Sequence, residues 1–259
     1  MVELLVVGGG RMGEALIGGL VAAGRTTKAI AVVEPVAERR AELAERFPGL
    51  GVLGEPVAAD GAVVAVKPQQ VPEVCRVLGA LGVRRILSIA AGVRLASMEA
   101  EVPDGVAVVR AMPNTPALVG SGASAIAAGT DAAEDDLAWA ESILGAVGTV
   151  VRVGERELDA VTGLSGSGPA YVFLVAEALI DAGVEQGLAR SVASDLAIQT
   201  LRGAAELLAT GEPPADLRAQ VTSPGGTTAA GVRALEDAAV RAAFASAVAA
   251  ATARSRELG

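Results

Sequence analysis

The chain has 259 residues, no histidine, only 2% aromatic residues and a formal net charge of −9. Without histidine it lacks Ser-His-Asp triads, imidazole acid–base groups and most zinc sites, so we expect no metal. The negative charge argues against nucleic acid as a partner, because binding phosphates needs clustered lysine and arginine. We find neither a run of 18 apolar residues nor a signal peptide, and expect a cytoplasmic protein without a membrane span.

Short apolar runs alternate with helical patterns as far as residue 153. The runs have the length and composition of buried parallel strands, and several end at glycine or proline. This alternation is typical of a doubly wound parallel sheet with helices on both faces, an α/β fold. We expect strands at 2–8, 29–34, 62–66, 85–91, 106–112, 124–128 and 149–153, and helices ending near Leu20 and Leu81 and spanning 35–47 and 132–144.

After residue 153 the apolar residues recur at helical spacing and no comparable strand run appears. We therefore predict a dinucleotide-binding domain at 1–153 and an all-helical domain at 154–259. Residues 240–252 form an alanine-rich segment that is apolar on more than one face, as in buried helices. A domain of about 100 residues has little core to bury it, which favours dimerisation through this half. The expected helices lie at 169–187, 189–210, 215–222, 229–236 and 238–257.

A glycine-rich loop, Gly8-Gly9-Gly10-Arg11-Met12-Gly13, follows the first strand and opens the first helix. It satisfies the G-x-G-x-x-G pattern in the context that dinucleotide binding requires. In that pattern Gly8 permits the tight turn, Gly10 lets the backbone approach the pyrophosphate, and Gly13 lets helix and strand pack closely. The helix N-terminus then faces the negative charge. The sequence thus predicts a Rossmann-like site at its N-terminal end.

The acid that binds the adenosine ribose in such sites lies roughly 20 residues beyond the loop, where Glu34 is found. A carboxylate there accepts hydrogen bonds from both ribose hydroxyls and repels a 2′-phosphate, which favours NAD(H). Arg39 and Arg40 follow closely and could pair with such a phosphate, although a solvated helix face is the simpler interpretation. The choice between NADPH and NADH stays open at this point.

The single cysteine, Cys75, lies within a helical pattern of apolar residues. One cysteine cannot form a disulfide within its own chain. In an apolar helical pattern a free cysteine usually behaves as a small hydrophobic residue. We therefore expect Cys75 to pack in the core rather than to react.

Five further segments, spread over nearly the whole chain, carry a second pattern. They are Ala65-Val66-Lys67-Pro68, Ser88-Ile89-Ala90-Ala91-Gly92-Val93, Arg110-Ala111-Met112-Pro113-Asn114-Thr115-Pro116, Leu164-Ser165-Gly166-Ser167-Gly168-Pro169-Ala170-Tyr171 and Ser223-Pro224-Gly225-Gly226-Thr227-Thr228. In order and spacing the chain resembles the pyrroline-5-carboxylate reductases, which make proline, and the last segment is characteristic of that family. The resemblance implies a Rossmann domain followed by an all-helical domain that interlocks with a partner subunit.

The resemblance also implies how the cofactor, NADPH or NADH, is held. The segments Val66-Lys67-Pro68 and Ala90-Ala91-Gly92 would flank the nicotinamide and its ribose, and Met112 and Asn114 would form the floor nearby. Lys67 is one of two lysines in the chain, which weighs slightly against its being an interchangeable surface charge. The full set expected to bind the cofactor is Gly8, Gly10, Arg11, Met12, Gly13, Glu34, Val66, Lys67, Pro68, Ala90, Ala91 and Gly92.

The expected substrate is a cyclic imino acid, pyrroline-5-carboxylate, whose imine carbon receives a hydride. A protonated imine needs no strong general acid, so the missing histidine is no obstacle. By resemblance Thr228 bonds the ring nitrogen, Ser223 and Thr227 hold the carboxylate together with the backbone of Gly225 and Gly226, and Glu155 lies near the cleft. The resemblance further implies a dimer or a higher oligomer built from dimers, such as the decamer of the family.

Two departures from the family and three alternatives remain. Glu34 stands where many members carry a basic or hydroxyl residue and prefer NADPH, and Ala219-Gln220 replaces a usual acidic residue. A β-hydroxyacid dehydrogenase would share the glycine loop but needs a lysine in the helical half, and no lysine follows Lys67. A non-catalytic redox-sensing module would carry a basic DNA-binding appendage, which is absent. A reductase for a related cyclic imino acid is not excluded, because pocket size depends on geometry.

Overall fold

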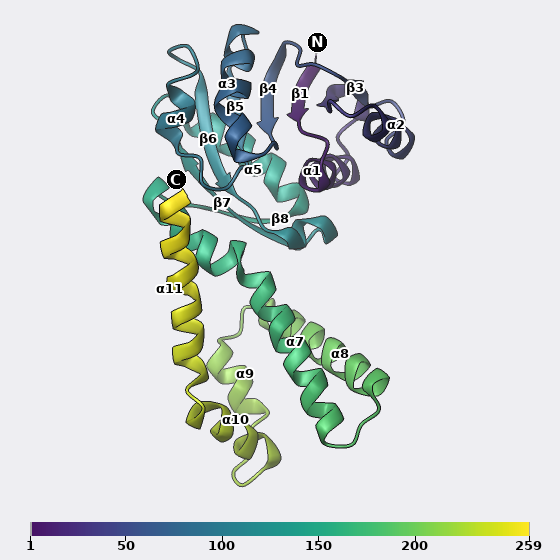
Figure 1. Cartoon of the computed structure of the whole chain (residues 1–259), viewed down its shortest axis with the longest axis vertical. Coiled ribbons are helices and arrows are strands. Elements are labelled where there is room, and N and C mark those ends of the chain that lie inside the picture. Colours follow the sequence, from purple (N-terminus) through teal and green to yellow (C-terminus); the bar gives the residue numbers. More distant parts are fainter. Residues whose placement is uncertain (1, 259) are drawn as a thin grey trace. The chain divides into compact units, whose positions relative to one another are not determined.

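The computed structural model of the chain describes residues 2–258, and its N-terminal part is built on one eight-stranded sheet (Figure 1). The strands are β1 (Val2–Val7), β2 (Ile30–Val33), β3 (Gly51–Leu53), β4 (Ala59–Val64), β5 (Arg85–Ser88), β6 (Ala107–Met112), β7 (Gly122–Ala128) and β8 (Gly148–Arg152). They lie in the order β3-β2-β1-β4-β5-β6-β7-β8. Because β1 pairs in parallel with both β2 and β4, the direction of winding reverses beside it.

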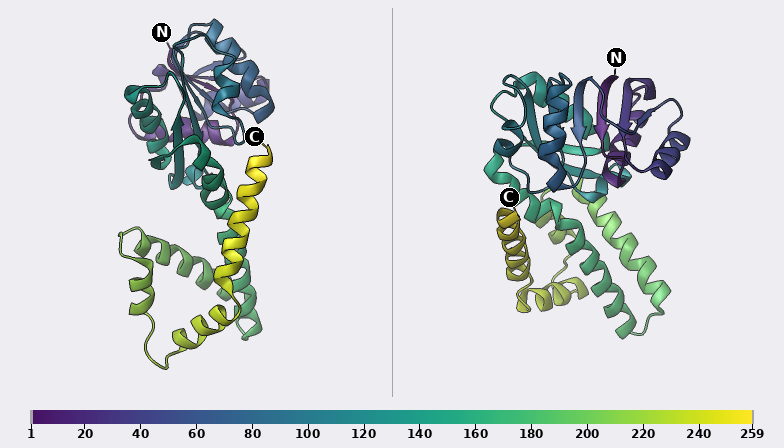
Figure 2. Two further views of the ribbon diagram at one scale, coloured as in Figure 1. Left: turned by 90° about the vertical axis from the view of Figure 1, so that its left-hand side faces the viewer. Right: turned by 45° about the horizontal axis from the view of Figure 1, so that its top comes forward.

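Helices cover both faces of this sheet, as the predicted doubly wound fold requires (Figure 2). Alternate residues of β1 enter two separate cores, because successive side chains of a strand point to opposite faces. Leu4 and Val6 belong to one core, and Leu5 and Val7 to the other. The first core includes residues of α1 (Arg11–Ala22), α2 (Ala37–Arg46) and α5 (Glu134–Leu144), and the second those of α3 (Val71–Ala80), α4 (Leu95–Glu99) and α6 (Leu158–Val161).

Two strands depart from the parallel direction that we expected in the sheet. β7 runs antiparallel to β6, with Met112 opposite Ala125, and β8 then runs parallel to β7. Only a short 3₁₀ turn, η3 (Thr115–Val119), joins β6 to β7. Parallel neighbours need a long crossover, so without a helix here the chain returns in the opposite direction. The doubly wound fold is as predicted, but the expected parallel direction is wrong for β7 and β8, which run opposite to the other strands.

The chain divides into two compact units. The first unit contains Met1–Ser167 and Ala249–Gly259, and the second unit contains Gly168–Val248. Helix α11 (Val240–Leu258) begins in the second unit and ends in the first, where the Ser255 hydroxyl donates a hydrogen bond of 2.7 Å to Asp159. The domain boundary that we placed after residue 153 falls before α6, and it stays a prediction.

The second unit is entirely helical and has almost no core of its own. Of its residues, Ala193 alone is buried. Large apolar side chains are exposed instead, including Phe173 (61%), Leu174 (64%) and Leu196 (57%). Its helices are α7 (Gly168–Glu185), α8 (Arg190–Leu208), α9 (Pro214–Gln220), α10 (Thr227–Asp237) and the first half of α11.

One helical stretch in the described chain, Glu155–Glu185, is long and apolar enough to cross a membrane. It combines the 3₁₀ turn η5 (Glu155–Glu157), α6, a π-helical turn at Thr162–Gly166 and α7. Length and composition alone are weak evidence for a span, because helices of soluble proteins pass the same test. The exposed apolar residues of α7 are part of this stretch. Contact with a helix of a partner protein would explain their exposure in the single chain as well as a membrane would.

Candidate cofactor and substrate site

The carboxyl ends of β1 and β4 meet where the strand order reverses. In open α/β sheets this is the place where ligands bind. Backbone pairing continues past the strand ends, since Gly8 N–H donates to the Val33 carbonyl at 2.9 Å and Ala65 N–H to the Val7 carbonyl at 2.8 Å. The structure thus brings the glycine loop and the segment after β4 together at one edge of the sheet.

The glycines of the loop fit the shape that a dinucleotide needs. Gly8 has φ +113°, and a Cβ there would lie 2.4 Å from the Ala65 carbonyl oxygen. A Cβ on Gly13 would lie 2.0 Å from the Gly8 carbonyl oxygen, so helix and strand approach too closely for a side chain. Around Gly10, by contrast, no heavy atom lies within 4 Å of the place for a Cβ. Gly10 precedes α1, whose first amides have no side-chain cap, so the loop offers open space and free N–H groups to an anion.

Glu34 lies against this loop. Its side chain follows β2 and is nearly buried, with 9% of the residue exposed. One carboxylate oxygen accepts the Gly9 N–H at 3.2 Å, and the other accepts the Val36 N–H at 3.0 Å. The acid that the spacing predicted for the ribose is therefore held beside the glycine loop in a fixed orientation.

The two arginines after Glu34 brace the same region. Arg39 donates through Nε to the Gly9 carbonyl at 2.9 Å and pairs with Glu42 at 2.7 Å and with Glu14. The hydrogen bonds to Glu42 and Glu14 raise the pKa of Arg39. Arg40 donates through Nη1 to the carbonyl oxygens of Glu34 and Pro35, at 2.9 and 2.8 Å. The solvated helix face that we favoured from sequence is therefore an incomplete description of both residues. Arg39 holds the glycine loop through Gly9, and Arg40 holds the backbone at Glu34 and Pro35.

The segments after β4 and β5 lie at the same edge. Ile89 N–H donates to the Val64 carbonyl at 3.1 Å, which extends the pairing of β4 with β5 beyond the strands. Gly92, with φ +78°, ends the turn that also contains Ala90 and Ala91. Val66-Lys67-Pro68 leads into a short 3₁₀ turn, η2 (Pro68–Gln70). The contact of either segment with a nicotinamide stays a prediction.

Asn114 and Met112 connect the end of β6 to the helical turn at Thr162–Gly166. The buried Asn114 donates through Nδ2 to the Ser165 carbonyl at 3.0 Å and accepts the Ala123 N–H at 2.8 Å. Met112 lies against Gly166, where a Cβ would come within 2.5 Å of the Met112 Cε. Both predicted residues therefore position the start of the helical half, and their contact with substrate stays a prediction.

Glu155 is tied down rather than free in a cleft. Its Oε1 accepts the N–H of Leu95, the first residue of α4, at 2.6 Å, and Nη1 of Arg110 at 3.0 Å. The side chain of Arg110 is only 8% exposed. We assigned Arg110 no role from the sequence, although an arginine inside an apolar strand was an available signal. A cavity of about 410 Å³ opens beside the pair and is lined by Arg94, Arg110, Glu155, Arg156, Asp159 and Arg256.

The segment Ser223–Thr228 forms a tight turn before α10. Gly226 N–H donates to the Ser223 carbonyl at 3.0 Å, and Gly225 has φ +71°. With proline second and a left-handed glycine third, this is the arrangement of a type II turn. No side chain caps α10, so the amides of Thr227 and Thr228 lie at its positive end beside their own hydroxyls and that of Ser223. Such a turn suits a carboxylate.

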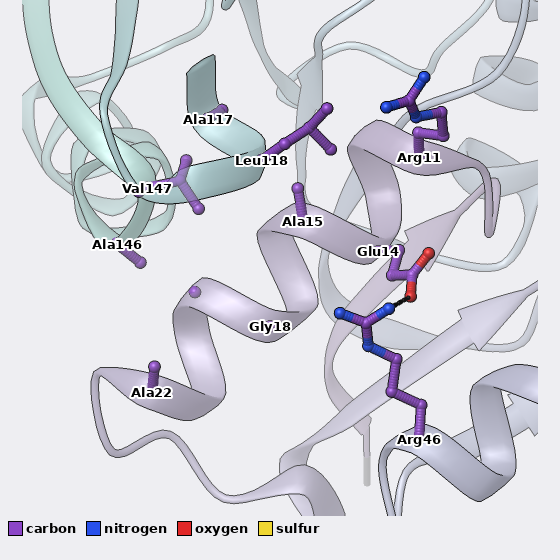
Figure 3. Close-up of a pocket in the computed structure, with 12 residues that line it drawn as sticks. Arg11, Glu14, Ala15, Gly18, Ala22, Arg46, Ala117, Leu118, Ala146 and Val147 are labelled. Atoms are coloured by element: carbon purple, nitrogen blue, oxygen red, sulfur yellow. Dashed lines mark ion pairs between the residues drawn. The ribbon is translucent and has the colours of Figure 1, made fainter. Parts of the chain in front are cut away.

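A separate cavity of about 550 Å³ lies beside α1 (Figure 3). Small residues of α1, including Ala15 and Ala22, face Leu118 and Val147 across it. Glu14 forms an ion pair with Arg46 at 2.6 Å on one side. Of the residues predicted to bind the cofactor, only Arg11 is among those that line this cavity, so it is not the dinucleotide crevice.

Cys75 lies on the buried face of α3 and is fully buried in the core, as predicted. Burial raises the pKa of its thiol to about 12, and Glu101 adds to the shift. A thiol with so high a pKa is protonated at neutral pH and a poor nucleophile. Within residues 2–258, no group of three or more cysteine, aspartate or glutamate side chains is arranged to hold a metal ion.

Comparison with known proteins matches both halves of the chain. A family model described as pyrroline-5-carboxylate reductase dimerisation matches residues 155–258, and one described as NADP oxidoreductase, coenzyme F420-dependent, matches residues 3–92. The pyrroline-5-carboxylate reductase of Corynebacterium melassecola is 44% identical over 268 residues, which cover 100% of this chain and 99% of that protein.

Solved structures agree over the same length. A pyrroline-5-carboxylate reductase from Coxiella burnetii is 36% identical with a TM-score of 0.95, covering 100% of this chain and 98% of that one. A pyrroline carboxylate reductase from Plasmodium falciparum, solved with NADP bound, is 30% identical with a TM-score of 0.83 and the same coverage. The predicted fold, a Rossmann-like unit followed by a helical dimerisation region, is confirmed.

Proposed function

Because the chain belongs to the pyrroline-5-carboxylate reductase family, we propose that it reduces pyrroline-5-carboxylate with NAD(P)H to L-proline. This reaction is the last step of proline biosynthesis. One observation supports it most directly: a single chain carries both the open glycine loop at Gly8–Gly13 and, at Ser223–Thr228, a tight turn with the uncapped amides of a helix start, which suits a carboxylate. The enzyme is then an oxidoreductase that acts on a C=N bond.

The residues at the edge of the sheet would hold the dinucleotide. The pyrophosphate would approach Gly10 and the first amides of α1, at Arg11, Met12 and Gly13, and Glu34 would bind the adenosine ribose. When bound, NAD(P)H supplies the hydride for the imine carbon. The nicotinamide end would lie along Val66, Lys67, Pro68, Ala90, Ala91 and Gly92.

The turn before α10 would hold the substrate. The backbone amides around Gly225 and Gly226 and the hydroxyls of Ser223 and Thr227 would bind the carboxylate, and Thr228 would bond the ring nitrogen. The imine arrives protonated, so addition of hydride converts its C=N bond to C–N and leaves the original proton on nitrogen. No side chain has to donate a proton in that step, which agrees with a chain that has no histidine.

Three further residues would support the substrate end. Met112 ends β6 and Asn114 follows it, and Asn114 fixes the backbone of Ser165 by a hydrogen bond of 3.0 Å. Glu155 holds the start of α4 and neutralises Arg110. We propose that these side chains shape the pocket, with Glu155 as a positioning residue.

The chain self-associates through its dimerisation region, and we propose a dimer that can assemble further, up to the decamer of the family. We also propose that it acts in the cytoplasm on a small molecule, without nucleic acid or membrane partners. The large apolar side chains exposed on the second unit support a protein partner for that unit.

A direct assay tests the proposed activity. Purified protein would be mixed with the five-membered cyclic imino acid and with NADH or NADPH in parallel, and the fall in cofactor absorbance would be followed together with proline formation. We expect cofactor oxidation to match proline formation mole for mole. If neither cofactor is oxidised above the rate without enzyme, the proposed function is wrong.

A further inference from the structure

The adenosine end of the proposed cofactor site contains one oriented acidic group. Two backbone donors hold the Glu34 carboxylate, Gly9 N–H at 3.2 Å on one oxygen and Val36 N–H at 3.0 Å on the other. A Cβ on Gly9 would lie 3.1 Å from Oε2 of Glu34, so the carboxylate packs directly on the glycine loop. Its position is therefore set by the backbone that would face the pyrophosphate.

This carboxylate still has capacity for hydroxyl donors. An ionised carboxylate has about four acceptor sites, and each oxygen of Glu34 uses one of them for a backbone N–H. The adenosine ribose of NADH offers 2′ and 3′ hydroxyls, which donate to such oxygens. The 2′-phosphate of NADPH, in contrast, is an anion of about −1.5 to −2 charge and is repelled by an adjacent carboxylate.

A site that favours NADPH needs a cation for this phosphate, and the two arginines that follow Glu34 on α2 already have partners. Arg39 is bonded to the Gly9 carbonyl and neutralised by Glu42 and Glu14. Arg40 places Nη1 between the carbonyl oxygens of Glu34 and Pro35. Both side chains stabilise the backbone that carries the carboxylate.

We infer that this reductase prefers NADH to NADPH and that Glu34 sets the preference. The inference deepens the proposed function and rests on it, because it requires a nicotinamide dinucleotide at this edge of the sheet. It distinguishes the chain from the Plasmodium falciparum relative, which was solved with NADP.

Binding measured without imine tests the inference separately from catalysis. The dissociation constants of NADH and NADPH would be measured by titration calorimetry on the full-length protein. We expect NADH to bind the unaltered protein at least about 10-fold more tightly, because like charges set side by side disfavour NADPH. If the unaltered protein binds NADPH as tightly as NADH, or more tightly, the inference is wrong. This outcome does not depend on the behaviour of any variant.

Two substitutions test the role of Glu34. Glu34→Gln removes the charge and keeps the size, and Glu34→Ser also opens room for a phosphate. In both we expect the NADPH-to-NADH ratio of dissociation constants to fall about 10-fold, mostly through tighter NADPH binding. The matched control Glu45→Gln removes the same charge from an exposed position on α2, and should leave the ratio unchanged. An unchanged ratio in folded Glu34 variants would overturn the assignment.

Arg40→Ala tests the opposite hypothesis, in which Arg40 binds the 2′-phosphate of NADPH. We expect both cofactors to be affected alike, so that their ratio is kept. A selective loss of NADPH binding would overturn the inference. In the imine assay, turnover that is faster with NADPH would overturn the inference and leave the proposed function intact, whereas absence of turnover with both cofactors would overturn the function.

Discussion

The two compact units of the chain bury their apolar residues in different ways. The first unit encloses its sheet between two cores, so that residues such as Leu4, Ile86 and Ile143 have no exposed surface. In the second unit only Ala193 is buried, while Phe173 and Leu174 are more than half exposed. The first unit therefore supplies its own hydrophobic cores. The second depends on surface supplied by another chain, as its match to a dimerisation family indicates.

The largest expected effect comes from placing a charge on the exposed apolar surface of the second unit, which tests whether another chain covers that surface. Phe173→Asp places a carboxylate on α7 where the phenyl ring is 61% exposed in the single chain. In a twofold dimer the change occurs twice, and losing two buried rings weakens association by about 10³-fold or more. Sedimentation over a range of protein concentrations would measure the shift from dimer to monomer.

The matched control is Val119→Asp in the first unit, where the valine is 79% exposed. We expect it to leave dimerisation unchanged, because the predicted contact lies in the helical region. If Phe173→Asp sediments as the unaltered protein does, α7 is not part of the contact and the second unit is covered in another way.

A second substitution tests whether the second unit also binds substrate, in addition to forming the dimer contact. Thr228→Ala removes the hydroxyl proposed to bond the ring nitrogen, at the start of α10. We expect kcat/KM for the imine to fall by about 10²-fold, as when one oriented hydrogen-bonding group is removed from an active site. Steady-state kinetics measure this, and sedimentation should show an unchanged dimer.

Thr210→Ala is the matched control, since the Thr210 hydroxyl donates to the Leu207 carbonyl at an exposed helix end. It should keep full activity. Wild-type kcat and KM in Thr228→Ala would remove Thr228 from the substrate site and reduce the second unit to a dimerisation element.

A third substitution tests the self-sufficiency of the first unit. Glu155→Ala leaves the nearly buried Arg110 without its carboxylate and the Leu95 amide without its acceptor. Because the Glu155 side chain is 32% exposed, solvent screening limits the loss, and we expect about 2 kcal/mol of destabilisation. Urea unfolding at one protein concentration would measure it.

Glu134→Ala provides the comparison, because Glu134 pairs with Arg152 at an exposed position. Its cost should stay below about 0.5 kcal/mol. If Glu155→Ala is as stable as Glu134→Ala but loses activity, Glu155 acts on the substrate rather than on the fold.

The features predicted from sequence are those set by neighbours in the chain. The positions of Gly8, Gly10 and Gly13 follow from local rules of turn and helix geometry, and Glu34 follows from a fixed spacing. The helices of the second unit likewise follow from a local apolar period. Short elements such as β3 and α4 were missed, since three to five residues carry too little pattern.

Features that depend on residues far apart in the sequence could not be predicted from these local rules. The direction of β7 depends on how the chain crosses between strands, and the partners of Glu155 lie 45 and 60 residues away in sequence. For α11, apolar composition predicted burial, yet Phe244 is 44% exposed in one chain. The apolar composition of α11 indicates that its surface is buried in the assembled protein. It does not show that a second chain, rather than this chain itself, buries that surface.

The smallest expected effect concerns the core of the first unit and depends on pH. Burial raises the pKa of Cys75 to about 12 from an ordinary value of 9.0. Above pH 9 the unfolded chain therefore loses a proton that the folded chain keeps, so stability is full below pH 9 and declines as the pH rises toward 12. At pH 10 the loss is about 1.4 kcal/mol relative to neutral pH.

Urea unfolding of the protein and of Cys75→Ala at pH 8, 9 and 10 isolates this contribution. Cys75→Ala loses the same packing free energy at every pH. Because it has no thiol, its free energy of unfolding lacks the decline that ionisation of Cys75 causes. The difference in stability between the two proteins should therefore shrink by about 1.4 kcal/mol between pH 8 and pH 10. Parallel profiles would show that the thiol ionises as readily in the folded unit as in the unfolded chain. The core around α3 would then be open to water, and the contrast with the second unit would be weaker than burial suggests.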